Sequence, residues 1–252
     1  EAALIRSDGR GGVALASTQG ADEEATCVVV LASDEAASSF RWRHQGGPTE
    51  CVGLELGSGG VFVRGRDPTL ERDQPNGTTA HIEVDGTLRW VLEDEALVQA
   101  APVDQGGPGD FQGSYEQPNP VMAYSGARDR LLAFTDARFD IGFQSRPLTQ
   151  AHVVDVGTGE LTDNGQTFGA SGAGVLSFAQ ARRSSGDLLL ALLVGQAPGA
   201  AFYTYDGRAR VEGLRPLGED WSERTLDQME HGPGAQLTLA WHEPGQTDQV
   251  YV

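Results

Sequence analysis

The chain has 252 residues, of which 36 are acidic and 18 are basic, so its formal net charge is -18, and every basic residue is an arginine. This charge argues against a nucleic-acid backbone as a partner, because phosphate binding needs a basic face. The absence of lysine excludes Schiff-base chemistry through a lysine amine, and no apolar run approaches the roughly 18 residues that a membrane-spanning helix needs.

Short apolar runs, rich in β-branched and aromatic residues, alternate with clusters of Gly, Asp, Asn and Pro along the whole chain. This alternation is typical of a many-stranded antiparallel protein. The length suits one large all-β domain or two smaller ones. Only the stretch from Leu92 to Ala101 has a helical pattern, and it runs directly into Pro102.

The apolar runs group into five similar blocks. We expect four strands in each of the first four blocks and three in the fifth. The blocks cover residues 3–44, 52–92, 121–162, 175–213 and 224–252. Between the second and third blocks, the Gly-, Pro- and Gln-rich stretch 101–120 is expected to form an inserted surface loop.

Several features recur from block to block. Phe40-Arg41-Trp42-Arg43 and Leu88-Arg89-Trp90-Val91 lie 48 positions apart. The second strand of each block begins its apolar run at Val13, Val61, Leu131, Leu188 and Leu237. The third and fourth strands of two blocks are separated by Asp85-Gly86 and Asp206-Gly207, and Asp-Gly accepts the positive φ of a tight hairpin turn.

Four strands per block and a repeat of about 50 residues predict an all-β fold, a β-propeller built of four-stranded antiparallel blades. A single β-sandwich or barrel is the alternative. Residues 1–252 then form a single propeller domain or a fragment of a larger propeller. Trp42 and Trp90 are expected on fourth, outer strands, where they pack between blades.

The fifth block stops at Val252, where the other blocks would turn into a fourth strand. About five blades are therefore expected, with the last one incomplete. Either the chain belongs to a larger propeller, or a second chain completes the last blade, since an unpaired sheet edge is a liability.

Two cysteines, Cys27 and Cys51, each lie at the start of an apolar run. They form either a disulfide, which would indicate an exported protein, or two buried free thiols. Neither belongs to a Cys-x-x-Cys pair, so a thiolate zinc site or redox motif is not indicated.

The segment Val84-Asp85-Gly86-Thr87-Leu88-Arg89-Trp90 resembles bacterial propeller repeats of the pyrroloquinoline-quinone-like and arylsulfotransferase-like kind. Those repeats close with an Asp-Gly turn, a short apolar strand and a tryptophan. Phe40-Arg41-Trp42 matches in part, and residues 205–211 match without the tryptophan. The resemblance implies propeller blades rather than a particular chemistry, and it carries over no catalytic residue.

No catalytic or metal-binding constellation stands out. The histidines are scattered and have no His-x-His or His-x-x-x-His spacing: His44, His81, His152, His231 and His242. His81 and His152 occupy similar places in the third strands of their blocks, which indicates a structural role. Gly169-Ala170-Ser171-Gly172-Ala173 lacks the final glycine of a Gly-x-Ser-x-Gly nucleophile motif. The sequence leaves any cofactor unassigned.

Two segments are candidates for ligand binding, because loops that are long for their fold tend to carry binding residues. The first is the predicted loop, with an aromatic and amide set suited to sugars or peptides. The second is an expected insertion, residues 138–146. The candidate residues are Phe111, Tyr115, Asn119, Arg138, Phe139 and Arg146.

The favoured function is a non-catalytic propeller that binds a protein, peptide or glycan, outside the cytoplasm. An enzyme with a funnel active site, arylsulfotransferase-like or quinoprotein-like, is the first alternative, and it requires at least two of His, Arg, Asp or Glu to converge on the propeller axis. One chain of a split or processed propeller, completed by a partner, is the second alternative.

Overall fold

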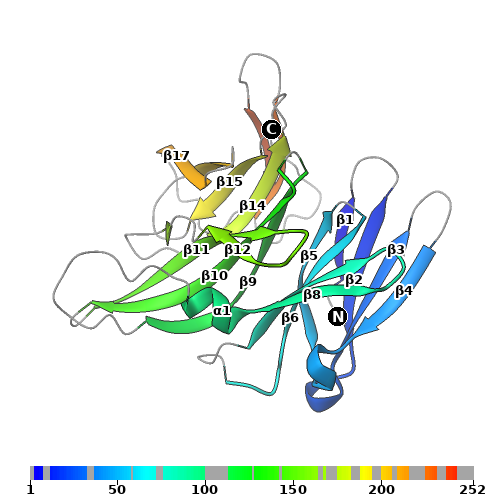
Figure 1. Ribbon diagram of the computed structural model, residues 1–252. Helices are drawn as coiled ribbons and strands as arrows, with labels where there is room; N and C mark the ends of the chain where they lie inside the picture. Colours follow the sequence, from blue (N-terminus) through cyan, green and yellow to red (C-terminus); the bar gives the residue numbers. More distant parts are fainter. Residues whose placement is uncertain are drawn as a thin grey trace.

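The computed structural model describes residues 3–7, 12–32, 37–57, 59–71, 76–99, 113–126, 128–141, 144–163, 167–168, 175–182, 188–194, 200–205, 209–215, 225–231 and 237–242. Within these ranges nearly all residues lie in antiparallel strands (Figure 1). In the first four sheets each strand pairs with the next one along the chain, so each sheet is a meander.

Blades 1 and 2 are complete four-stranded sheets. Blade 1 contains β1 (Leu4–Ser7), β2 (Val13–Gln19), β3 (Thr26–Ala32) and β4 (Ala37–Trp42). Blade 2 contains β5 (Glu50–Gly57), β6 (Gly60–Arg66), β7 (Gly77–Glu83) and β8 (Leu88–Glu93), followed by the helix α1 (Asp94–Gln99).

The later sheets follow the same plan. Blade 3 contains β9 (Gly113–Ser125), β10 (Arg130–Ile141), β11 (Gln144–Asp155) and β12 (Leu161–Asp163), with the short β13 (Thr167–Phe168) also paired to β11. Blade 4 contains β14 (Val175–Arg182), β15 (Leu188–Val194), β16 (Ala200–Tyr205) and β17 (Ala209–Arg215). The fifth sheet contains β18 (Thr225–His231) and β19 (Leu237–His242).

The first strands of consecutive sheets contact one another: β1 with β5, β5 with β9, β9 with β14 and β14 with β18. The sheets therefore succeed one another in chain order around an axis lined by their first strands, from the blue blade 1 onward in Figure 1. This arrangement is a β-propeller, and it confirms the five predicted blocks.

Blade 3 differs from its prediction. Residues 113–120, expected in a loop, belong to β9, and residues 138–146, expected as an insertion, include the ends of β10 and β11. β10 and β11 pair without a register shift from Arg130 opposite Asp155 to Ile141 opposite Gln144. Residues 130–155 therefore form a long hairpin. The Gly-, Pro- and Gln-rich residues 113–120 form a strand because their backbone pairs with β10, although their side chains have low strand propensity.

One other boundary also shifts. The predicted helix begins at Asp94 rather than Leu92, because Leu92 is still paired with Thr79 across β8 and β7. Residues 101–112 of the predicted loop and the expected last strand at 249–252 lie outside the described residues.

Successive blades pack face to face through apolar cores. Between blades 1 and 2 the core includes Val29, Leu31 and Leu54, and between blades 2 and 3 it includes Phe62 and Leu131. Each core joins alternate residues of two neighbouring sheets, as expected for strands whose side chains point to opposite faces. This packing fixes how one blade sits on the next.

The two tryptophans lie between blades, as predicted. Trp42, in β4, contacts Gly65 of blade 2 so closely that a Cβ on that glycine would lie 2.7 Å from the indole. Trp90, in β8, donates a hydrogen bond from Nε1 to the Val156 carbonyl of blade 3 at 2.8 Å. Both side chains are at least 90% buried, so they tie an outer strand to the following blade.

Cys27 and Cys51 form a disulfide, with their Cα atoms 5.0 Å apart. Cys27 lies in β3 and Cys51 in β5, so the bond joins blade 1 to blade 2. The sequence left a disulfide and two free thiols as alternatives, and the structure selects the disulfide because the two strands meet across the blade interface.

Removal of this bond should destabilise the pair of blades. A Cys27→Ala/Cys51→Ala double variant is expected to lose about 3 kcal/mol of unfolding free energy, because the crosslink limits the unfolded chain. Urea denaturation of both proteins with and without dithiothreitol measures the effect. Dithiothreitol should weaken only the wild-type protein, and equal stability of the two oxidised proteins would contradict the expectation.

Candidate functional site

Blade 1 buries one face and leaves the other partly exposed. Along β2 and β3 buried residues alternate with half-exposed ones, and the buried set packs against blade 2. The register places the other aliphatic residues of the blade together on the opposite face. We call this surface the open face; it consists of Ile5, Val13, Leu15, Val28 and Val30.

The open face exposes large aliphatic side chains. Ile5 is 57% and Val13 is 39% exposed. In blade 2, by contrast, the first six residues of β6 and of β7 are all buried, because blades 1 and 3 cover both faces of that sheet. Contiguous exposed apolar surface on a soluble protein marks an interaction site.

Polar groups border the open face. Arg41, on the outer strand β4, donates a hydrogen bond from Nη2 to Gln19 Oε1 at 2.8 Å, and Ser39 is exposed on the same strand. An apolar centre with a polar rim is the usual anatomy of a protein–protein interface.

The open face lies outside the binding segments predicted from the sequence, although the sequence carries a signal for it. Every residue from Cys27 to Leu31 is apolar. A strand with one solvated face alternates apolar and polar residues, whereas a continuous apolar run is typical of a strand covered on both faces. The run therefore indicates a cover on both sides, and the described residues supply only one.

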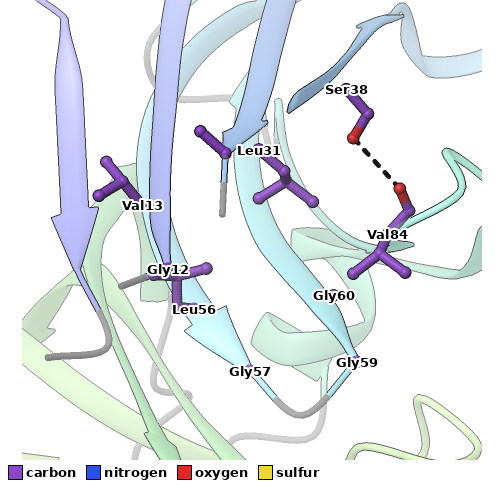
Figure 2. A pocket seen from close by; sticks show the side chains of 10 residues that line it. Gly12, Val13, Leu31, Ser38, Leu56, Gly57, Gly59, Gly60 and Val84 are labelled. Carbon is purple, nitrogen blue, oxygen red and sulfur yellow. Dashed lines mark hydrogen bonds between the residues drawn. The ribbon is translucent and has the colours of Figure 1, made fainter. Parts of the chain in front are cut away.

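A pocket of about 500 Å³ lies beside the open face, between blades 1 and 2. Figure 2 shows Leu31 of blade 1 and Leu56 and Val84 of blade 2 around it, with the glycines of the β5–β6 hairpin. The described residues that line it are Gly12, Val13, Leu31, Ala32, Ser38, Leu56, Gly57, Gly59, Gly60 and Val84. Within this set Ser38 supplies the one side-chain hydroxyl, which donates to the Val84 carbonyl at 3.2 Å.

The predicted ligand-binding residues lie mainly on blade 3. Tyr115 and Asn119 belong to β9, Arg138 and Phe139 to β10, and Arg146 to β11. Phe111 lies outside the described residues. We call the outer parts of these three strands, residues 113–118, 136–141 and 144–149, the blade 3 ribbon.

The register separates these residues into two faces. Phe139 is paired with Arg146, and the neighbouring position Ala137 is paired with Tyr115. Successive residues alternate between faces, so Tyr115, Phe139 and Arg146 share one face of the ribbon and Arg138 occupies the other. Asn119 falls in β9 where the register with β10 shifts.

Charged groups meet at the axis, as the enzyme alternative requires. Arg6 of β1 lies 3.8 Å from a carboxylate oxygen of Glu55 in β5, and the other oxygen accepts a hydrogen bond from the Tyr124 N–H of β9 at 3.4 Å. Glu55 is only 4% exposed. The contacts join the first strands of three successive blades.

A buried polar cluster lies between blades 2 and 3. Arg64 donates from Nη2 to both carboxylate oxygens of Asp94 at 2.8 Å, and both residues are fully buried. Thr135 Oγ1 lies 2.9 Å from His152 Nε2. Arg64 Nε, Arg64 Nη1 and His152 Nδ1 have no hydrogen-bond partner in the structure, and buried groups of this kind usually bind internal water.

The two histidines singled out in the sequence, His81 and His152, lie in the third strands β7 and β11 and are 1% exposed. Burial is the main cause that lowers the pKa of each, with Arg89 adding to it at His81 and Arg64 at His152. Across the residues that the structure covers, no three His, Cys, Asp or Glu side chains are arranged to hold a metal ion. Nor does any described helix have the length and apolar character needed to cross a membrane.

No protein-family model matches the chain, and no curated protein sequence matches it either. Solved structures do resemble it in fold. A protein of unknown function from Dyadobacter fermentans is 14% identical with a TM-score of 0.55, and the match covers 95% of this chain and 74% of that one.

Two further structures match more weakly. YCF48 bound to a D1 peptide is 11% identical with a TM-score of 0.41, over 96% of this chain and 63% of that one. Zg3597, a family 117 glycoside hydrolase from the marine bacterium Zobellia galactanivorans, is 8% identical with a TM-score of 0.42, over 82% and 67%. Similarity at these identities concerns the fold alone, so the function must be argued from this chain's own surfaces.

The pKa of His152 predicts a loss of stability in acid. Burial lowers the pKa from 6.5 to about 3. The unfolded chain therefore binds a proton below pH 6.5 that the folded chain does not, and stability falls as the pH drops from 6.5 toward 3. The contribution is about 1.4 kcal/mol for each pH unit in that window.

A His152→Gln variant keeps a partner for Thr135 but has no group that titrates. Between about pH 7 and about pH 4.5, the wild-type protein should lose about 2.5 kcal/mol more unfolding free energy than the variant. Urea denaturation at both pH values measures the difference, and the comparison at about pH 7 is the control because His152 is neutral in both states. Equal losses for the two proteins would contradict the assignment.

Proposed function

We propose that the chain is a non-catalytic β-propeller module that binds a protein partner through the open face of blade 1. The observation that carries this proposal is the contrast between the two faces of one sheet. One face is buried against blade 2, whereas the other presents aliphatic side chains of the same kind to solvent.

Burial of this surface favours association. Covering the part of each aliphatic side chain that is still exposed contributes roughly 1 kcal/mol per residue. Another sheet suits the open face, since two sheets pack with their side chains interdigitated about 10 Å apart. A glycan fits less well, because aliphatic residues offer neither aromatic stacking nor hydrogen bonds to hydroxyl groups.

The charge of the chain restricts the partner. A net charge of -18 repels acidic proteins and a second copy of the chain. A neutral or basic partner is therefore favoured, and its association should be faster at low ionic strength. The proposal also includes an extracytoplasmic location, which the interblade disulfide supports because such bonds persist in oxidising compartments.

Val30 lies at the centre of the open face, opposite Leu15 and Ser39 in the register. A Val30→Glu variant should lose at least tenfold in affinity for the partner, because the partner would bury an unpaired carboxylate. Quantitative capture from the native source, followed by titration of the purified partner, measures the effect.

Leu70→Glu is the matched control, since Leu70 is an aliphatic residue that is 42% exposed and lies outside the open face. It should retain the partner, and both variants should melt close to the wild-type temperature. Identical capture by wild type and Val30→Glu would overturn the proposal. Native mass spectrometry that finds a polypeptide heavier than 26.7 kDa and no second chain would overturn it as well, because another part of the same polypeptide would then cover the open face.

We propose a second contact on the blade 3 ribbon. Tyrosine and arginine are enriched among the residues that dominate binding energy, and the register brings Tyr115, Phe139 and Arg146 to one face. Phe111 and Asn119 remain proposed contacts of the same ligand on sequence grounds alone.

The ribbon provides its own matched pair of variants. Arg146→Ala should weaken partner binding several-fold, whereas Arg138→Ala, which removes the same charge from the opposite face, should have a smaller effect. Isothermal titration with the purified partner measures both. Equal effects would show that charge, rather than the face of the ribbon, controls binding.

A further inference from the structure

We propose that the pocket between blades 1 and 2 binds an aliphatic side chain of a peptide segment that carries basic residues beside it. This site is separate from the centre of the open face. Its volume of about 500 Å³ falls within the range of ligand-binding pockets, roughly 300 to 1,000 Å³.

The pocket is lined for an apolar group. Val13, Leu31, Leu56 and Val84 supply aliphatic surface from both blades. Val84 is 61% exposed at the pocket, so a bound side chain would cover apolar area that water now contacts. Among the described lining residues the one side-chain hydroxyl, that of Ser38, already donates to the Val84 carbonyl.

Gly57, Gly59 and Gly60 of the β5–β6 hairpin line the pocket without a side chain. A Cβ on Gly57 would lie 2.2 Å from the Phe62 ring, and a Cβ on Gly60 would lie 2.3 Å from the Ile82 carbonyl oxygen. Both positions are therefore restricted to glycine by packing on the far side of the hairpin. At Gly57 and Gly60 the pocket is therefore lined by backbone alone.

The two walls of the pocket are also held relative to each other. The Ser38 to Val84 hydrogen bond joins β4 to the turn after β7, and the Cys27–Cys51 disulfide joins the same two blades elsewhere in their interface. A pocket whose walls are tied in this way is preformed, so binding requires little ordering of the protein.

Charge indicates what flanks the apolar group. Val84 is followed by Asp85, a fully exposed carboxylate whose pKa is lowered by hydrogen bonds from Thr87, so it is ionised over the whole physiological range. The preceding residue, Glu83, already pairs with Arg89 at 3.3 Å. With a chain charge of -18, the surroundings of the pocket favour a positively charged segment.

Three fluorescein-labelled peptides of equal length test the proposal by fluorescence polarisation. One has a central leucine between two arginines, one has the leucine between two serines, and one has a serine between two arginines. The first should bind at least tenfold more tightly than each of the others at low salt, and added salt should reduce that advantage over the serine-flanked peptide.

Variants locate the binding. Val84→Ser should weaken the leucine–arginine peptide at least fivefold, Asp85→Asn should weaken it about twofold, and Leu70→Ser, at an exposed aliphatic position outside the pocket, should leave it unchanged. Equal binding of the two leucine peptides would overturn the basic flank. Unchanged binding in Val84→Ser, or loss in Val30→Glu instead, would overturn the pocket as the site and leave the proposed function of the open face to its own test.

Discussion

Face-to-face burial between successive sheets is the constraint on which the rest of this structure depends. The central strands of blades 1 and 2 carry apolar or buried residues on both faces, so these two sheets need a cover on each side. Blade 2 meets this condition, with six consecutive buried residues in both β6 and β7. Among the described residues blade 1 meets it on one side only, and the open face is the surface that those residues leave partly exposed.

The interblade contacts also determine the shape of the candidate sites. Trp42 against Gly65, the Cys27–Cys51 bond and the Ser38 to Val84 hydrogen bond hold blade 1 on blade 2 at different points of one interface. Because the blades are tied at these points and Gly57, Gly59 and Gly60 line the space between them, that space persists as a pocket. On the other side of blade 2, bulky aromatic packing and the Arg64–Asp94 pair fill the corresponding interface.

Blade 3 combines a structural inner half with an extended outer half. The inner half of β10 contributes Leu131 to the core, whereas its outer half continues into the ribbon that carries the predicted binding residues. A long hairpin offers a defined register, unlike a loop, so the ribbon presents its residues on two distinguishable faces. This is why Arg138 and Arg146, equivalent in the sequence analysis, have different expected roles.

The sequence by itself determined the number of blocks, the position of most strands and the interblade place of Trp42 and Trp90, because apolar runs, Asp-Gly turns and a repeat of about 50 residues are local properties of a chain. Only the tertiary structure decided that Cys27 and Cys51 are bonded, that residues 113–120 continue a strand, and that the described residues leave one face of blade 1 partly exposed. Each of these depends on which strands meet across a sheet or an interface, and a one-residue change in register would move every side chain to the other face.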